Sequence, residues 1–156
     1  MKKIKTYIFT VIAVCSLSLI VGYNLLINTA NAEQSEVITV YKNPSCGCCK
    51  KWVKHMQDAG FTVQTRNVSN LVPVKNKFGV NAAYQSCHTA KVGKYFVEGH
   101  VPAADIKRML KEKPDIKGLA VPGMVTGSPG MEGNHKEAYD VLAIDKKDHY
   151  SVYSSH

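Results

Sequence analysis

Residues 37–68 read VITVYKNPSCGCCKKWVKHMQDAGFTVQTRNV, which is the pattern of a strand, a helix and a second strand. The β-branched and aromatic residues at 37–41 predict the first strand, and Asn43-Pro44-Ser45 ends it. Ser45 is expected to cap a helix that starts at Cys46. Four residues then recur at helical spacing on one apolar face: Cys49, Trp52, Val53 and Met56.

Gly60 ends this helix, and residues 61–68 predict the second strand. A strand–helix–strand unit of this length places its two strands parallel to each other. Farther along, the sequence predicts a short helix over 70–78, a β-hairpin around Gly93-Lys94 and a helix from Pro102 to Pro114. This order of elements is that of a thioredoxin-like domain, so the predicted fold class is α/β.

A C-terminal extension follows these elements. Residues 123–133 read GMVTGSPGMEG, a segment rich in glycine and methionine that has no periodicity and therefore predicts a loop. Residues 139–144 and 150–153 are apolar or aromatic and predict two further strands. Residues 33–156 are long enough for one domain but not for two.

The first 32 residues have the layout of a secretory signal peptide. Lys2, Lys3 and Lys5 precede an apolar run over 7–22, and Ala30-Asn31-Ala32 is a small-x-small cleavage signal. Cleavage would place residues 33–156 in the periplasm or another extracytoplasmic compartment, without a membrane anchor and without Cys15. The alternative is an uncleaved anchor, because residues 7–27 are long enough to span a bilayer.

The composition is that of an ordinary globular protein. The 156 residues are 45% hydrophobic and 21% charged, with a net charge of +8 to which the leader lysines contribute three. The remaining basic excess is mild and is spread along the chain. We therefore expect no nucleic-acid partner.

Cysteines are clustered in the sequence Cys46-Gly47-Cys48-Cys49, at the predicted strand-to-helix turn. The helix N-terminus and nearby lysines favour the thiolate, which both attacks disulfides and binds metals. A redox dithiol needs two sulfurs, and a third would compete with them. A site for a soft metal gains from each added thiolate, so the cluster favours metal binding.

Cys87 is expected to join this cluster. In a thioredoxin-like fold the residues before the third strand face the C-x-x-C turn and usually include a cis-proline, whose place is taken here by Cys87-His88-Thr89. Three alternatives remain open: a single Cys46–Cys49 disulfide, a structural zinc site with three cysteines and His88, and an iron–sulfur cluster.

Methionines and histidines are weaker candidates. Met124 and Met131 lie in the glycine-rich loop, where a thioether could ligate Cu(I) or simply pack. His88 is either a ligand or a neighbour that supports one. His100 is expected to cap or pack at the end of the hairpin. His55 is expected on the polar face of its helix. Three further histidines are expected in solvent, where each could bind Cu(II) loosely: His135, His149 and His156.

Three segments together resemble the CopG-type copper-resistance proteins: KNPSCGCCKKW at 42–52, SCHTAKVGKYFVEGHVPAADIKRML at 86–110 and GLAVPGMVTGSPGME at 118–132. The resemblance runs from about Val37 to Asp145. It implies an exported protein of thioredoxin-like fold that binds copper at the C-x-C-C motif and a later cysteine. One departure is Val125, where that family commonly has proline after the first loop methionine.

We therefore predict an exported protein for copper resistance that holds Cu(I) at Cys46, Cys48, Cys49 and Cys87, with Met124, Met131 and His88 as further candidate ligands. More than one ion could be held in a thiolate-bridged cluster, with exchange between Cu(I) and Cu(II) and transfer to an efflux or chaperone partner. Metal binding is favoured over catalytic turnover, which the sequence leaves open. The alternatives are a thiol–disulfide oxidoreductase using Cys46 and Cys49, and an arsenate-reductase-like enzyme, against which the leader argues.

Overall fold

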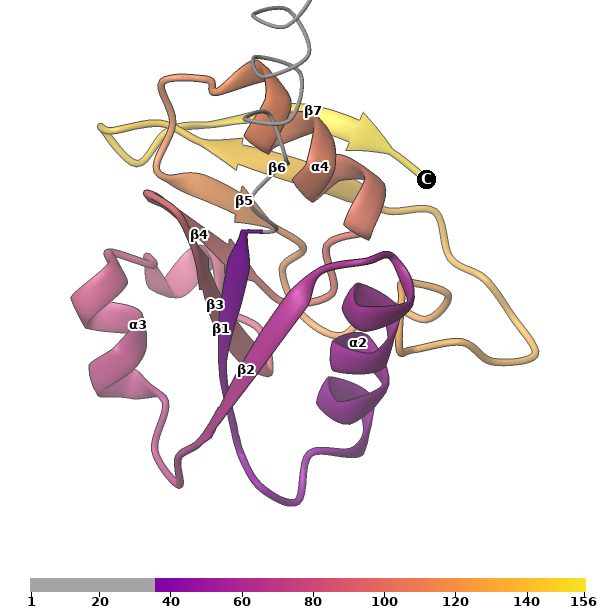
Figure 1. The fold of residues 1–156 in the computed structure, drawn as a ribbon. Helices are drawn as coiled ribbons and strands as arrows, with labels where there is room; N and C mark the ends of the chain where they lie inside the picture. Colours follow the sequence, from indigo (N-terminus) through magenta and orange to yellow (C-terminus); the bar gives the residue numbers. More distant parts are fainter. Residues whose placement is uncertain (1–35) are drawn as a thin grey trace, which may run out of the picture. The chain divides into compact units, whose positions relative to one another are not determined.

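The computed structural model of the protein describes residues 36–156, and within them the predicted βαβ unit is present (Figure 1). Strands β1 (Val37–Lys42) and β2 (Thr62–Asn67) pair in parallel, and helix α2 (Gly47–Asp58) connects them. The predicted signal peptide over 1–32 lies outside the described residues. None of the helices in residues 36–156 has both the length and the apolar character needed to cross a membrane.

Helix α2 buries the face that its sequence predicts. Cys49, Trp52 and Met56 are fully buried, and the Trp52 indole N–H donates a hydrogen bond of 2.9 Å to the Val101 carbonyl. The predicted start of the helix is wrong by one residue. Cys46 is the N-cap and its sulfur accepts from the backbone N–H of Cys49 at 3.3 Å.

Ser45 was the expected cap, but its hydrogen bonds go elsewhere. Its backbone N–H and its hydroxyl both donate to the side-chain oxygen of Asn43, at 2.9 and 2.7 Å. The Asn43 side chain thus stabilises the turn after β1 by accepting both hydrogen bonds from Ser45. The first turn of α2 is left with a sulfur as its cap.

The central elements follow the predicted order. Helix α3 (Val72–Phe78) and a short 3₁₀ turn, η1 (Ala82–Tyr84), lead to the hairpin of β3 (His88–Val92) and β4 (Tyr95–Glu98). Helix α4 (Ala103–Glu112) comes next. β1 lies between β2 and β3, so the hairpin extends the sheet beside the βαβ unit.

Three strands complete a sheet with the order β2-β1-β3-β4-β5-β6-β7. Strands β6 (Asp140–Ile144) and β7 (Tyr150–Ser155) were predicted, whereas β5 (Gly118–Ala120) was not. β5 has three residues and begins with a glycine, so it lacks the signals of a strand. That glycine is needed, because a Cβ on Gly118 would lie 2.1 Å from the Phe96 carbonyl oxygen.

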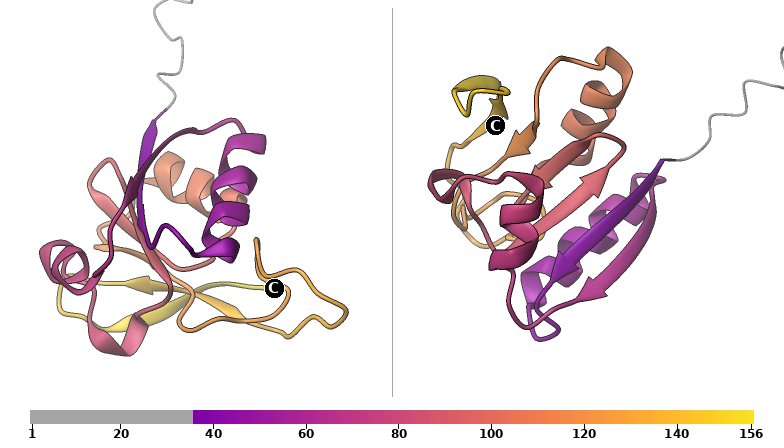
Figure 2. Two further views of the ribbon diagram at one scale, coloured as in Figure 1. Left: turned by 90° about the horizontal axis from the view of Figure 1, so that it is seen from below. Right: turned by 90° about the vertical axis from the view of Figure 1, so that its left-hand side faces the viewer.

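Helices cover both faces of the sheet (Figures 1 and 2). α2 and α4 lie on one face, over the larger core, which includes Trp52, Ile106 and Leu119. α3 and η1 lie on the other, over a smaller core around Phe96 and Ile144. The mixed α/β class is therefore confirmed. The turn from β1 into α2 opens at one end of the larger core, where the cysteines lie.

Candidate metal centre

The turn between β1 and α2 places three cysteines at a helix N-terminus. Cys46 caps α2, and Cys48 and Cys49 lie in its first turn. Cys49 is fully buried, whereas Cys46 and Cys48 are partly exposed. The unpaired N–H groups and the positive end of the helix dipole at this position favour thiolate sulfur.

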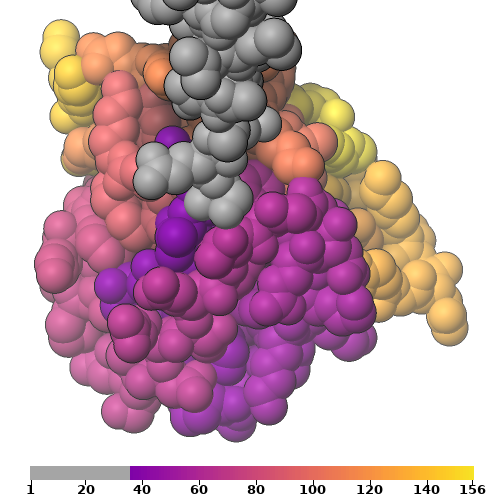
Figure 3. Space-filling view, in the orientation of Figure 1, coloured from indigo at the N-terminus to yellow at the C-terminus, as the bar shows by residue number. Residues whose placement is uncertain are grey.

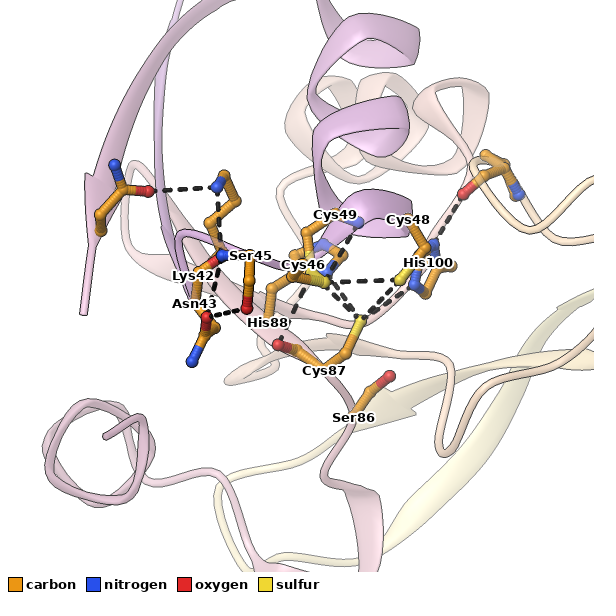
Figure 4. Close-up of a disulfide and its surroundings, with 12 residues drawn as sticks. Lys42, Asn43, Ser45, Cys46, Cys48, Cys49, Ser86, Cys87, His88 and His100 are labelled. Atoms are coloured by element: carbon orange, nitrogen blue, oxygen red, sulfur yellow. Dashed lines mark hydrogen bonds between the residues drawn. A yellow bond between two sulfur atoms is a disulfide. The ribbon is translucent and has the colours of Figure 1, made fainter. Parts of the chain in front are cut away.

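Cys87 reaches this turn from the segment before β3, as the sequence predicts (Figure 4). Its sulfur lies 3.5 Å from Cys49 Sγ and 4.0 Å from Cys48 Sγ, while Cys46 and Cys48 are 3.4 Å apart. All four sulfurs lie within 4.8 Å of one another. Donor atoms at these separations can share one or more metal ions.

Two of the four sulfurs are joined in this structure. Cys46 and Cys49 form a disulfide, whereas Cys48 and Cys87 are free thiols. The structure therefore represents the oxidised form of the cluster. Reduction of the disulfide consumes two electrons and two protons and provides two further thiols, so the number of available sulfur ligands depends on the redox state.

His100 also belongs to the site, although its sequence position predicted only capping or packing at the end of the hairpin. Its Nε2 atom lies 3.0 Å from Cys87 Sγ, and its Nδ1 atom lies 2.7 Å from the Pro129 carbonyl oxygen. A carbonyl can only accept, so Nδ1 carries the hydrogen and Nε2 presents a lone pair to the sulfur. The neutral ring is a hydrogen-bond acceptor for the thiol, and it is a potential metal ligand.

The proximity of His100 to Cys87 could have been predicted from the register of the β3–β4 hairpin. Thr89 pairs with Glu98 and Val92 with Tyr95 across the Gly93-Lys94 turn. Continuing this register by two residues places Cys87 opposite His100. The position of the turn was predicted correctly, so this pairing was available from the sequence.

His88 lies beneath the cysteines in the larger core. Its Nδ1 atom is 3.3 Å from Cys87 Sγ, and its ring centroid is 4.5 Å from that of Trp52. Nε2 is buried and has no hydrogen-bond partner in the described part of the chain. Burial, followed by electrostatic interactions with any proton on His100 and with the Lys75 and Lys42 ammonium groups, lowers the pKa of His88 well below its usual value, so the ring is neutral.

Burial also controls the protonation of Cys87 and His100, whose side chains face each other. It raises the pKa of the Cys87 thiol to about 12, with a further contribution from Cys48. It lowers the pKa of His100, although the Pro129 carbonyl and Glu132 oppose this effect. Cys87 is therefore a thiol that donates to a neutral imidazole, and binding a metal would release its proton.

The glycine-rich loop packs against the same end of α2, and Figure 3 shows this segment beside the helix. A Cβ on Gly130 would lie 2.8 Å from both the Cys48 carbonyl oxygen and the Trp52 nitrogen. Met131, which follows this contact, is partly buried, whereas Met124 is 48% exposed. Met56 and Met109 are fully buried core residues, as expected.

Residues 84–131 match a family described as a protein of unknown function, DUF411. Two solved structures of copper resistance protein CopG, forms 2 and 1, are similar to the chain at 43% identity, with TM-scores of 0.75 and 0.74. Each match covers 79% of this chain and 99% or 98% of the other. No curated protein sequence matches at a significant level.

Proposed function

Because the chain belongs to the CopG family of copper resistance proteins, we propose that it binds copper as its cargo at Cys46, Cys48, Cys49 and Cys87. The observation that carries this proposal is the convergence of four sulfurs within 4.8 Å of one another. Thiolates are soft ligands and select Cu(I) over harder cations. In this proposal the copper is held as Cu(I) and its binding supports copper resistance.

The ligand set of the proposed site changes with oxidation. With the Cys46–Cys49 disulfide intact, the sulfur donors are Cys48 and Cys87, and His100 Nε2 lies beside the latter. After reduction four thiolates are available, enough to bridge more than one ion. Oxidation of Cys46 and Cys49 to the disulfide releases two electrons, which would reduce two Cu(II) ions to Cu(I).

Additional ligands are proposed from the residues that border the sulfurs. Met131 follows the loop residue that packs on Cys48, and a thioether there suits Cu(I). Met124 is 48% exposed and is the weaker of the two methionine candidates. His88 Nδ1 and His100 Nε2 both border Cys87, so these nitrogens suit Cu(II) as well as Cu(I).

Export through a cleaved signal peptide over 1–32 is part of the proposal. The periplasm or another extracytoplasmic compartment permits disulfides, which agrees with the disulfide at Cys46 and Cys49. Cys46 and Cys48 are partly exposed, so a partner could approach their sulfurs. Such exposure suits transfer to a copper-efflux or copper-chaperone protein better than permanent storage.

A metal count tests the proposal. Protein purified anaerobically from copper-fed cells expressing the full chain is analysed for copper, zinc and iron per chain, together with free thiols. We expect at least one copper per chain, and fewer in Cys87→Ser. The matched control is Cys15→Ser, which lies in the predicted leader and should change nothing. Metal-free protein with Cys46 and Cys49 locked in a disulfide would refute copper binding.

The second candidate is a thiol–disulfide oxidoreductase, favoured by the disulfide across Cys46-Gly47-Cys48-Cys49. In that function Cys46 attacks a substrate disulfide and Cys49 resolves the mixed disulfide, without copper. Reduction of insulin in the absence of metal is the measurement. It should persist in Cys87→Ser if the oxidoreductase is correct, whereas copper binding would be weakened in the same variant.

A further inference from the structure

A buried ion pair lies on the side of the sheet that α3 covers. Lys75 of α3 contacts Glu98, the last residue of β4, and the two residues are 4% and 0% exposed. Burying two charges is costly, and an apolar pair of similar volume is often as stable or more so. The net contribution of this ion pair to stability is therefore expected to be small.

The hydrogen bonds of this pair converge on the segment that carries Cys87. Glu98 accepts from the Ser86 N–H at 2.7 Å and from the Thr89 hydroxyl at 2.6 Å. Lys75 donates to the Ser86 carbonyl and to the Thr89 hydroxyl, both at 3.1 Å. Lys75 and Glu98 thus bind both backbone groups of Ser86, which precedes Cys87. They also bind the side chain of Thr89, which lies two residues after Cys87.

The same segment also fixes the start of the glycine-rich loop. The Ser86 hydroxyl donates to the Gly123 carbonyl, and the Gly123 N–H donates to the Gln85 carbonyl at 3.3 Å. Gln85 and Cys87 belong to no strand, and Ser86 forms only an isolated bridge with Gly123. Side-chain contacts therefore supply much of the restraint on the position of Cys87.

We propose that Lys75 and Glu98 are positioning residues for the candidate copper site, which hold Cys87 at the distance from Cys48 and Cys49 that a shared metal requires. They act through Ser86 and Thr89 and touch no sulfur themselves. The inference rests on the proposed function for its purpose. The thiol geometry that it predicts can be measured without copper.

The decisive variant replaces both charges, Lys75→Met with Glu98→Leu, and so leaves no unpaired buried charge. The control is Lys54→Met, which removes an exposed ion pair with Asp58. The probe is phenylarsine oxide, which bridges two nearby thiols. In full-chain protein whose Cys46–Cys49 disulfide is intact, Cys48 and Cys87 are the two thiols available in residues 36–156. Peptide mapping separates their bridging from any reaction of Cys15.

We expect the double variant to fold with a lowered thermal unfolding midpoint, because the Ser86 N–H and the Thr89 hydroxyl lose their partner, and to bridge Cys48 to Cys87 about 10-fold more slowly. After reduction its Cu(I) affinity should fall by about 10- to 100-fold, as for other outer ligand supports. The control should bridge at the original rate. If the double variant does not fold, Thr89→Val removes the hydroxyl that accepts from Lys75 and donates to Glu98, and should slow bridging by about threefold or more, because two hydrogen bonds are lost.

An unchanged bridging rate in the folded double variant, or in Thr89→Val, would overturn the inference. Slower bridging in a chain that binds no copper even as the original protein would support the positioning of Cys87 and reject the proposed function. The same set of samples therefore distinguishes failure of the positioning role from failure of copper binding.

Discussion

His100 and Cys87 face each other across the open end of the β3–β4 hairpin, with Nε2 3.0 Å from Sγ. The second nitrogen of His100 is engaged by the Pro129 carbonyl at 2.7 Å, so the loop fixes the tautomer of the ring. The hairpin and the glycine-rich loop therefore meet at one imidazole, beside the sulfur of Cys87.

Replacing His100 by leucine should weaken Cu(I) binding by about 10- to 100-fold, the usual effect of losing a group that supports a metal ligand. The affinity falls because the Cys87 thiol would lose the ring nitrogen that accepts its hydrogen bond, and the Pro129 carbonyl would lose the ring N–H that donates to it. Competition with a Cu(I)-specific chelator measures the affinity. His135→Leu is the control, since His135 is exposed in the same loop region. Equal affinities for the two variants would contradict the role of His100.

Reduction of the Cys46–Cys49 disulfide should strengthen Cu(I) binding by at least about 100-fold, because it doubles the number of sulfur donors. The measurement is an anaerobic Cu(I) titration of the protein before and after reduction and desalting. The Cys46→Ser variant cannot form this disulfide, so its affinity should not depend on reduction. The same affinity in both forms of the original protein would argue for a site at Cys48 and Cys87 alone.

Gly130→Ala should destabilise the protein by about 1–3 kcal/mol, the typical cost of overpacking. The added Cβ would lie 2.8 Å from the Cys48 carbonyl oxygen, and φ at Gly130 is +86°. Gly133→Ala is a matched control, because its nearest neighbour would be a methyl carbon at 3.6 Å. Urea unfolding of the two variants gives the difference. Equal stability would show that the loop does not pack on α2 in solution.

The periodic elements of this fold could be predicted from the sequence because local residues determine them. Trp52 and Met56 mark the buried face of α2, and Gly93-Lys94 marks the hairpin turn. The convergence of Cys87 on the cysteine turn also follows from the order of the elements. These predictions depend on spacing and on chain topology, and both are visible in the sequence.

Other features depend on tertiary contacts that spacing does not encode. β5 contains only three residues and forms because β4 and β6 lie on either side of it. Lys75 resembles an exposed lysine on a short helix, and its burial is explained by Glu98, 23 residues away, together with the acceptors on Ser86 and Thr89. The course of the glycine-rich loop depends on the close approach of Gly130 to α2.

His55 provides a test of pH dependence away from the cysteines. Its Nε2 atom accepts from the backbone N–H of Ala103, the first residue of α4, at 3.2 Å. Burial lowers the pKa of His55 below 6.5, although Glu132 and Asp58 oppose this effect. Above pH 6.5 the His55 ring is mainly neutral in both the folded and the unfolded chain. As the pH falls through 6.5 the unfolded chain binds the proton first, so stability is lost on the acid side.

His55→Gln should reduce this loss between pH 7 and pH 5, because the amide oxygen can still accept from Ala103 and does not titrate. Thermal unfolding midpoints of the copper-free protein across this range are the measurement. His135→Gln is the control, since His135 is an exposed histidine. A pH dependence that is the same in all three proteins would contradict the assignment.

The route of the chain between β5 and β6 has a consequence for how this protein can change. Ala120 and Leu142 are paired neighbours in an antiparallel ladder, so a tight turn of a few residues could join these two strands. The chain instead leaves the sheet, passes over the first turn of α2, contacts His100 and returns. The sheet does not need this detour for its own register. Exchanges in the detour, away from the tight contact at Gly130, can therefore alter the candidate metal centre without changing the pairing of β5 with β6.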